Sequence, residues 1–318
     1  MEAQRKPQFP PQTQPQQPGK EYVMCPLPQA INPDYKPSAK LNGKVALVTG
    51  GDSGIGRSVC YHFALEGATV AFTYVQGIED RDKDDTLKML LKAKSSDAGD
   101  PIAIATDVSS EEDCKKVVDQ VASKYGRIDI LVNNAGVQQY TNSVEEITEA
   151  WLVRLFRTNI FGYFFMTKHS LKHMKEGSCI INTTSVTAYV GSPHQLLDYL
   201  STKGSIVSFT RGLALRLVDQ RNSCQWCGSR SGLDPTATRI SACVRGRVPG
   251  VGRADEKSRT ALRNSTFLCL PGIQSVLVLH DRPSSSSQWG YDCKWLDCSV
   301  MLCSFCKWSH VHAIICTC

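Results

Sequence analysis

The stretch Thr49–Gly56, TGGDSGIG, decides how the rest of the chain is interpreted. It directly follows a short apolar run, KVALVT, and opens a segment with helical spacing, IGRSVCYHFALEG. At such a strand-to-helix turn Gly50 permits the tight bend, Gly54 lets the backbone approach a pyrophosphate, and Gly56 lets helix and strand pack closely. The N–H groups of the first helical turn then face the phosphates. A glycine-rich turn alone also serves as a plain connection, so its flanking strand and helix carry the interpretation.

The alternation of strands and helices continues along the chain. Four further apolar runs predict strands: TVAFTYV (69–75), PIAIATDV (101–108), IDILVNNAG (128–136) and SCIINTTSV (178–186). Helical spacing marks CKKVVDQVASKYG (114–126), one long helix within 151–174, and a helix after Tyr199 with Ile206, Phe209, Leu213 and Leu217 on one face. This order predicts an α/β fold with a doubly wound parallel sheet.

The segment YLSTKG places Tyr199 and Lys203 four residues apart, on one face of that last helix. A nearby ammonium favours the phenolate and lowers the pKa of the tyrosine. Tyr199 is therefore a candidate general acid and base for an alcohol/carbonyl pair. A surface tyrosine and lysine one turn apart would be the simpler interpretation if the pair stood alone.

Four motifs stand in a fixed order: TGGDSGIG, NNAG (133–136), a serine at the end of the fifth strand run, and YLSTK. From about residue 41 to 220 this arrangement resembles the short-chain dehydrogenase/reductase family. Within that family, LNGKVALVTGGDSGIGR and LLDY are most similar to plant glucose and ribitol dehydrogenase homologues. The resemblance implies a Rossmann fold, a nicotinamide cofactor (NADP or NAD) and a catalytic tetrad.

By motif position the tetrad consists of Asn159, Ser185, Tyr199 and Lys203. The resemblance implies that Ser185 hydrogen-bonds the substrate oxygen, Tyr199 exchanges its proton, Lys203 binds the nicotinamide ribose and tunes Tyr199, and Asn159 holds a water of the proton relay. It also implies that Asp107 and Val108 flank the adenine. The implied cofactor-binding set is Gly50, Ser53, Gly54, Ile55, Gly56, Asp107, Val108, Asn134, Ala135, Gly136, Tyr199 and Lys203.

Two details bear on this assignment. Ser185 and Tyr199 are 14 residues apart, one more than the family's usual spacing, and Gln195 is the candidate extra residue. The end of the second strand run, AFTYV, has no acidic side chain to hold a ribose 2′-hydroxyl, and Arg81 follows shortly after. The sequence therefore favours NADP over NAD.

The chain divides into three parts. Residues 1–40 comprise two segments. Residues 1–20 are a Pro/Gln-rich tail that is expected to be disordered, and the residues that follow are expected to form an arm lying on the domain. A binding tail for a proline-recognition module is the alternative. Residues 41–220 form the nucleotide-binding domain with the catalytic residues, and residues 221–318 form an irregular tail rich in Cys, Ser and Trp.

This tail differs in composition from the rest. Ten of the 14 cysteines and four of the five tryptophans lie after residue 219. Residues 219–318 carry 12 Lys+Arg against 7 Asp+Glu, a net charge of +5, which leaves +1 of the total +6 for the first 218 residues. The sparing use of cysteine in the first part suits a reduced, cytoplasmic protein, and neither a signal pattern nor a membrane-spanning apolar run is evident.

A change of reading frame explains the tail. Shifted by one nucleotide, codons for Arg221–Gly232 can encode GIRVNGVAPGP, which the family carries at its sixth strand. The same shift lets Leu277–Trp295 encode SSYMTGQVLHPNGGTIVNG, which resembles the family's C-terminal strand. We therefore expect a frame change near Gln220, with residues 297–318 translated from 3′ untranslated sequence, and the last strands of the sheet missing or disrupted.

The tail's cysteine pairs allow another interpretation. Cys224 and Cys227, and Cys303 and Cys306 followed by His310 and His312, have spacings found at zinc sites. The frame change gives these cysteines a simpler origin, so no metal is expected. A redox role for Cys224 and Cys227 lacks the strand and helix that such a motif needs.

The sequence thus predicts an oxidoreductase that transfers a hydride between NADP or NAD and a sugar, polyol or small aldehyde or ketone. Its partner is a small molecule, with neither nucleic acid nor membrane expected, and the in-frame family member is expected to form a homo-oligomer. The competing hypothesis is an inactive or unstable fragment that at most binds nucleotide, because loss of the last strands would expose the fifth strand as an edge.

Overall fold

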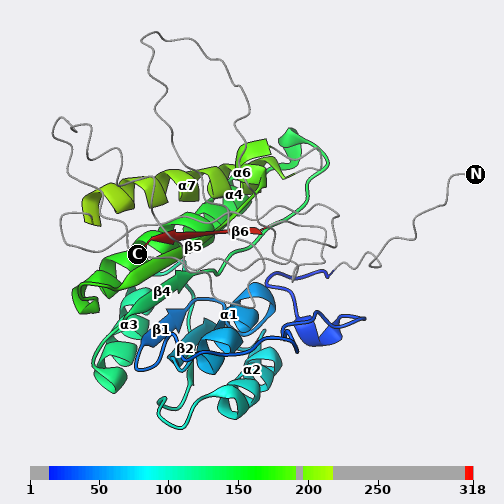
Figure 1. The fold of residues 1–318 in the computed structure, drawn as a ribbon. Helices are drawn as coiled ribbons and strands as arrows, with labels where there is room; N and C mark the ends of the chain where they lie inside the picture. Colours follow the sequence, from blue (N-terminus) through cyan, green and yellow to red (C-terminus); the bar gives the residue numbers. More distant parts are fainter. Residues whose placement is uncertain (1–13, 191–195, 218–311, 318) are drawn as a thin grey trace, which may run out of the picture.

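Five parallel strands and the helices between them form the sheet that the sequence pattern predicts (Figure 1). The structure, a computed structural model, describes residues 14–190, 196–217 and 312–317. The parallel strands lie in the order β3-β2-β1-β4-β5. Their bounds are β1 Val45–Val48, β2 Thr69–Tyr74, β3 Ile102–Ala105, β4 Ile130–Asn133 and β5 Cys179–Ser185. The prediction of a doubly wound parallel sheet is confirmed.

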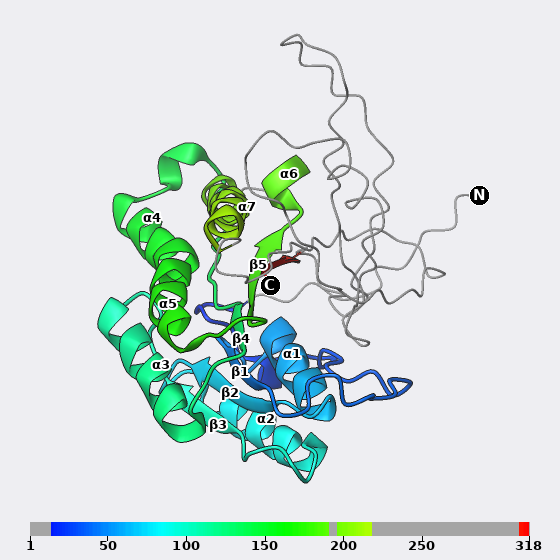
Figure 2. The same cartoon turned by 60° about the vertical axis from the view of Figure 1, so that its left-hand side comes forward.

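Helices cover both faces of this sheet. They are α1 Gly54–Leu65, α2 Asp80–Ala93, α3 Glu111–Tyr125, α4 Glu149–Phe156, α5 Gly162–Ser170, α6 Thr187–Val190 and α7 Leu197–Leu217. Short 3-10 turns lie at Glu21–Val23, Val144–Glu146 and Leu171–His173. Figure 2 shows α1 and α2 on one side of the sheet and α3, α5 and α7 on the other. Local signals fix the bounds of α3, because the Ser110 side chain accepts the N–H of Asp113 and Gly126 ends the helix at φ 76°.

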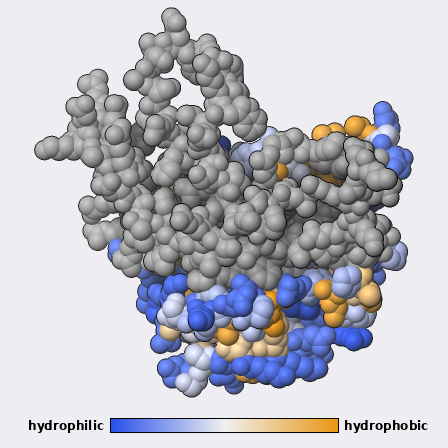
Figure 3. Space-filling view, turned by 45° about the vertical axis from the view of Figure 1, so that its right-hand side comes forward, coloured by the Kyte–Doolittle hydropathy of each residue, from blue (hydrophilic) through white to orange (hydrophobic). Residues whose placement is uncertain are grey.

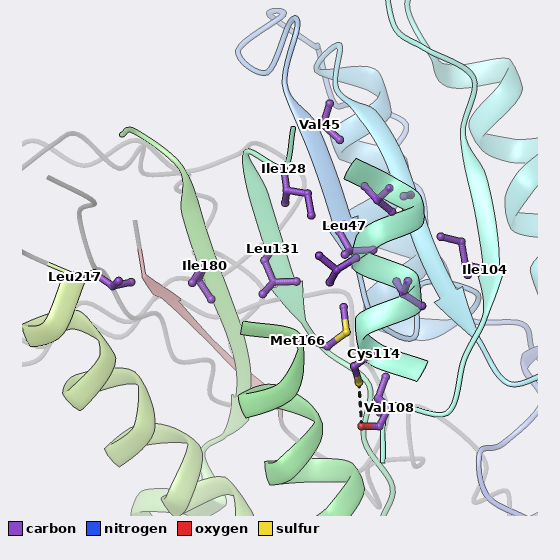
Figure 4. Packing of buried hydrophobic residues seen from close by; sticks show 14 residues of the cluster. Val45, Leu47, Ile104, Val108, Cys114, Ile128, Leu131, Met166, Ile180 and Leu217 are labelled. Carbon is purple, nitrogen blue, oxygen red and sulfur yellow. Dashed lines mark hydrogen bonds between the residues drawn. The ribbon is translucent and has the colours of Figure 1, made fainter. Parts of the chain in front are cut away.

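The alternation of side chains along β1 divides the core between the two faces. Val45 and Leu47 join the cluster that packs against α3, α5 and α7, part of which Figure 4 shows. Ala46 and Val48 point the other way, into the cluster with Phe63 of α1 and Leu90 of α2. Each fully buried large side chain contributes roughly 1.5–3 kcal/mol by removal from water. Packing on both faces explains why β1 is a continuous apolar run.

A sixth strand, β6 (His312–Thr317), runs antiparallel to β5, with His312 opposite Ser185 and Thr317 opposite Ile180. The expectation that β5 forms an exposed edge was therefore wrong. The segment HAIICT contains two β-branched isoleucines, which favour strand conformation. The antiparallel direction of β6 departs from the parallel pattern of the other five strands.

The long helix expected within 151–174 is interrupted. Between α4 and α5 the residues Arg157–Phe161 form a π-helical turn, and α5 is followed by the 3-10 turn at Leu171–His173. The apolar residues of 151–174 were interpreted as one continuous helix, so this interruption was not predicted. Single π-helical turns occur frequently at functional sites, and this one contains Asn159.

The described N-terminal residues lie against α1. Ser58 donates to the carbonyl of Ala30 at 3.1 Å, and the buried carboxylate of Glu66 accepts the N–H of Lys40 at 2.8 Å. The first part of the predicted disordered tail, residues 1–13, lies outside the described residues.

The described surface is mainly hydrophilic in the view of Figure 3, with apolar residues in small separate areas. Among the described residues, helices are too short or too polar to cross a membrane.

The strand order reverses between β1 and β4, which are neighbours although two strands separate them in the sequence. In open α/β sheets ligands bind outside the carboxyl ends of the strands at this reversal. The turn that follows β1 and the residues that follow β4 therefore mark the place to look for a site.

Candidate active site

The turn after β1 can be built only with glycine at several positions. Gly50 and Gly54 have φ values of 60° and 53°, a region that disfavours other residues. A Cβ atom on Gly56 would lie 1.9 Å from the carbonyl oxygen of Gly50, whereas a Cβ on Gly54 would meet no atom within 4 Å. Gly56 thus allows close packing, and Gly54 leaves open space at the first turn of α1.

The loop after β4 is tied to this turn. The Asn134 amide donates to the carbonyls of Thr49 and Gly50 at 3.1 and 3.0 Å, and the N–H groups of Asn134 and Ala135 donate to the Thr49 hydroxyl. A Cβ on Gly136 would lie 3.3 Å from Oδ1 of Asn159 and 3.8 Å from Nζ of Lys203. The structure therefore brings TGGDSGIG, NNAG, Asn159 and Lys203 together.

Ser53 and Ile55 flank Gly54 in the same turn. Ser53 is the extended residue immediately before α1, and its side chain makes no capping hydrogen bond. Both residues are partly exposed, so their backbone lies at the edge of the sheet where a ligand can reach it.

The two residues predicted to flank adenine differ in exposure. Asp107 follows β3 and is exposed, and its carboxylate accepts the N–H of Ser109 at 2.9 Å. The Val108 side chain is 7% exposed and belongs to the core, where its carbonyl accepts from the Cys114 thiol (Figure 4). In this conformation Asp107 is the more accessible of the two.

Asn159 is fully buried in the π-helical turn. Its Oδ1 accepts the N–H of Val137 at 2.8 Å, and its Nδ2 donates to the carbonyl of Val137 at 3.0 Å and to the Thr202 hydroxyl at 3.2 Å. The side chain therefore connects the loop after β4 to α7.

Tyr199 and Lys203 lie near the start of α7 and are 3% and 1% exposed. The Lys203 Nζ atom is 5.4 Å from the centroid of the Tyr199 ring and donates to the carbonyl of Thr183 at 3.0 Å. Burial lowers the pKa of Lys203 to about 7. The lysine is thus held beside the tyrosine, at a pKa that lets it gain or lose a proton near neutrality.

Ser185 ends β5 and is 1% exposed. Its hydroxyl accepts from the N–H of Thr187 at 3.2 Å and hydrogen-bonds the Thr187 hydroxyl at 2.9 Å. The proposed extra residue Gln195 lies in 191–195, outside the described residues.

Two further residues at this site were not predicted. Tyr163 is buried and donates to the same Thr183 carbonyl that accepts from Lys203, at 3.0 Å in both cases. Burial, followed by the charge of Tyr199, raises the pKa of Tyr163. Asp198 precedes Tyr199 and accepts from the Tyr199 N–H at 2.7 Å and from the Trp151 indole at 2.6 Å. The acidic residue in LLDY was the available signal for Asp198.

Strand β2 ends at Tyr74 without an acidic side chain of its own, as the sequence predicted, but a later acidic side chain lies beside its end. Glu79 folds back and accepts the N–H of Val75 at 2.7 Å, and it is 4% exposed. Burial first, and then the nearby Asp52, raise the pKa of Glu79 to about 8. Burial and the neighbouring carboxyl thus favour the neutral form of Glu79. Arg81 is exposed and stacks over the Tyr22 ring of the N-terminal arm at 4.5 Å.

A buried charge network joins that arm to the start of α1. Glu21 accepts the N–H of Gly54 and pairs with Arg57, which also pairs with Asp82 at 3.1 Å. Asp82 in turn accepts the N–H groups of Glu21 and Tyr22 at 2.9 and 3.2 Å. The sequence carries no short-range signal for these contacts.

Within 14–190, 196–217 and 312–317, no group of three or more His, Cys, Asp or Glu side chains could hold a metal ion. Cys224, Cys227, Cys303, Cys306 and His310 lie outside these residues.

Comparison with known proteins agrees with this geometry. A family model described as short chain dehydrogenase matches residues 44–223. The chain is 66% identical over 213 residues to a glucose and ribitol dehydrogenase from Daucus carota, which covers 67% of this chain and 73% of that protein. It is 62% identical over 209 residues to "NADPH-dependent aldehyde reductase 1, chloroplastic" from Arabidopsis thaliana, covering 66% of this chain and 72% of the relative.

Solved structures show the same fold. A short chain dehydrogenase from Burkholderia cenocepacia in complex with NADP aligns with a TM-score of 0.53 and 29% identity. The alignment covers 58% of this chain and 72% of that one.

Proposed function

The chain belongs to the short-chain dehydrogenase family, and from that premise we propose that it is an NAD(P)-dependent oxidoreductase that interconverts hydroxyl and carbonyl groups of sugars, polyols or small aldehydes and ketones. The observation that carries this proposal is the buried pair of Tyr199 and Lys203 beside the glycine turn at the carboxyl ends of β1 and β4. The names of the carrot and Arabidopsis relatives support the substrate class.

The residues at the carboxyl-end edge fit a dinucleotide. The first turn of α1 suits a pyrophosphate once the Glu21 carboxylate, which accepts the Gly54 N–H, has moved away, and Ser53, Ile55 and Gly56 lie in the same turn. Asn134, Ala135, Gly136, Asp107 and Val108 complete the proposed cofactor set. A bound nicotinamide would supply or accept the hydride.

The protein's own part is to position the substrate and move a proton. Ser185 would donate a hydrogen bond to the substrate oxygen, and the Tyr199 hydroxyl would give its proton to that oxygen or take it back. When protonated, Lys203 favours the phenolate form of Tyr199. Asn159 would keep the loop after β4 and α7 in register, through its contacts with Val137 and Thr202.

NADP is the preferred cofactor in this proposal. Strand β2 ends without an acidic side chain, and burial together with the nearby Asp52 raises the pKa of Glu79, the carboxyl that folds back toward that end, which favours its neutral form. A neutral carboxyl does not repel a 2′-phosphate as an ionised one would. The complex of the Burkholderia cenocepacia relative with NADP is consistent with this preference.

The test is a spectrophotometric assay of the purified chain. Consumption of NADPH and NADH is followed with small aldehydes, and reduction of NADP and NAD with ribitol and glucose. Y199F should abolish turnover, whereas Y125F should preserve it, because Tyr125 lies on α3 and donates to the carbonyl of Asp100. Equal turnover in wild type and Y199F would contradict the assignment of Tyr199.

A second candidate function is a fragment that binds nucleotide without turnover. The family model ends at residue 223, close to the frame change that we propose near Gln220. Residues 221–318 would then lack the family's last segments. Resequencing the transcript across the codons for residues 215–225 tests this directly. One superfluous nucleotide would support the frame change. An intact frame, together with cooperative melting and turnover of the purified chain, would refute both the frame change and the inactive fragment.

We also propose that the enzyme works in the cytoplasm and that its in-frame form is a homo-oligomer. The name of the Arabidopsis relative specifies the chloroplast, so import into plastids by a fluorescent fusion is the result that would contradict the first proposal. Light scattering during size-exclusion chromatography tests the second.

A further inference from the structure

The N-terminal arm crosses from one side of the molecule to the glycine turn. The carbonyl of Gln17 accepts from Arg154 of α4 at 3.2 Å, and four residues later Glu21 reaches Gly54, at the first turn of α1. Figure 2 shows α4 and α1 on different sides of the sheet. Residues 17–21 therefore connect elements of both layers, and they end where the proposed function expects the cofactor's phosphates.

The Glu21 carboxylate sits in the position of an anionic ligand. Its residue is 5% exposed, its Oε2 accepts the Gly54 N–H at 2.5 Å, and its Oε1 accepts from Nη1 of Arg57. The N-terminus of a helix attracts anions through its unpaired N–H groups and the positive end of its dipole. Glu21 thus binds the Gly54 N–H and the Arg57 guanidinium, two groups that would also bind a phosphate.

The remaining contacts would survive if this side chain left. Arg57 stays bonded to Asp82 at 3.1 Å and to the carbonyl of Asp52 at 2.8 Å. Asp82 holds the backbone of Glu21 and Tyr22 at 2.9 and 3.2 Å. The carboxylate can therefore turn away while the backbone of the arm keeps its anchor, and few buried polar groups would lose their partners.

We propose that residues 17–24 are a strap whose Glu21 side chain competes with the cofactor's pyrophosphate for the first turn of α1, so that Glu21 limits the affinity for the dinucleotide. This inference rests on the proposed function, because it requires that the dinucleotide binds at the glycine turn. A ligand-like group already in place must be displaced, and its affinity for the turn is subtracted from that of the cofactor.

The test measures the dissociation constants of NADPH and NADP by titration calorimetry in the full chain. E21Q removes the charge but keeps a hydrogen-bond acceptor, and E21A removes both. The matched control is E112Q, which removes one negative charge from an exposed ion pair with Lys116 on α3. Thermal melting of each variant verifies that it is folded.

We expect E21Q to bind NADPH at least about 5-fold more tightly than wild type, which is the lower end of typical coupling between sites. E21A should bind more tightly still, and E112Q should stay within about two-fold of wild type. Unchanged or weaker binding in both Glu21 variants, with normal binding in wild type, would overturn the strap and leave the proposed function intact. Failure of all four proteins to bind either nucleotide would overturn the proposed function and the strap with it.

Discussion

Because Lys203 is buried, we predict that the free energy of unfolding depends on pH, whether or not substrate is present. Burial moves the pKa of Lys203 from 10.5 to about 7, and the side chain is 1% exposed. At a pH between about 7 and 10.5, Lys203 keeps its proton in the unfolded chain and has released it in the folded chain. The free energy of unfolding should therefore rise with pH across this range, by up to about 1.4 kcal/mol per pH unit.

The substitution K203M isolates this effect. Methionine has nearly the same length and no charge, so the variant loses the titration and the hydrogen bond to the Thr183 carbonyl. Below pH 7 the wild type carries the whole cost of a buried charge, at most roughly 5 kcal/mol, and the loss of the hydrogen bond offsets about 1–3 kcal/mol of the gain. We expect K203M to be the more stable protein at pH 6.

The assay is urea unfolding of wild type and K203M at several pH values from 6 to 9. The stability difference should shift toward the wild type by roughly 2 kcal/mol between pH 7 and pH 9. K168M is the control, because Lys168 is 62% exposed and its ion pair with Glu111 lies on the surface. A stability difference between K203M and wild type that does not vary with pH would show that Lys203 keeps its proton on folding.

Three further predictions follow from the geometry. Y199F should lower kcat by about 100-fold or more, through loss of the proton donor, and leave the dissociation constant of NADPH within about three-fold, which separate kinetic and binding measurements check; a kcat near that of wild type would contradict the role of Tyr199. G56A should abolish cofactor binding, because its Cβ would lie 1.9 Å from the Gly50 carbonyl oxygen. G212A should instead raise the free energy of unfolding by about 0.5–1 kcal/mol, because its Cβ meets no atom within 4 Å and alanine favours a helix. Equal effects of the two substitutions on the melting temperature would contradict this description of the turn. D82A should lower the free energy of unfolding by about 3 kcal/mol and speed proteolysis within residues 14–43. The reason is that Arg57 and the backbone N–H groups of Glu21 and Tyr22 would lose the carboxylate that accepts from all of them. An unchanged digestion pattern would mean that other contacts anchor the arm.

Local signals were sufficient for the parallel strands and for the turn at Gly54. Strand β1 is a continuous apolar run because both of its faces are covered, and a glycine is required where φ is positive or a Cβ would clash. These features depend on neighbours within a few residues, so the sequence pattern contains them. The spacing of Tyr199 and Lys203 places both on one helix face, but their assignment as a catalytic pair required the order of the four motifs along the chain.

The π-helical turn at Asn159 was out of reach of the same reasoning. Its side chain bonds Val137 and Thr202, which are 22 and 43 residues away in the chain. Apolar periodicity reports which face of a helix is buried and carries no information about a polar residue that bridges distant elements. Strand β6 was not predicted for a similar reason, because it pairs with β5 across more than 100 residues of the chain.

The acidic residues around the glycine turn show the same limit and give it a functional meaning. Glu21 meets Gly54 across 33 residues, and Asp82 meets the Glu21 backbone across 61. No role was predicted for Glu79 from the sequence, yet its side chain folds back toward the end of β2, and burial together with the nearby Asp52 raises its pKa. Arg57 pairs with Glu21 and Asp82 and donates to the Asp52 carbonyl, while Glu79 interacts electrostatically with Asp52 and Asp82. An anion-binding turn bordered by carboxyl groups binds phosphate only as strongly as those groups allow, through their protonation or their displacement. In our proposal the affinity for the cofactor depends on these distant acids as well as on the glycines of the turn.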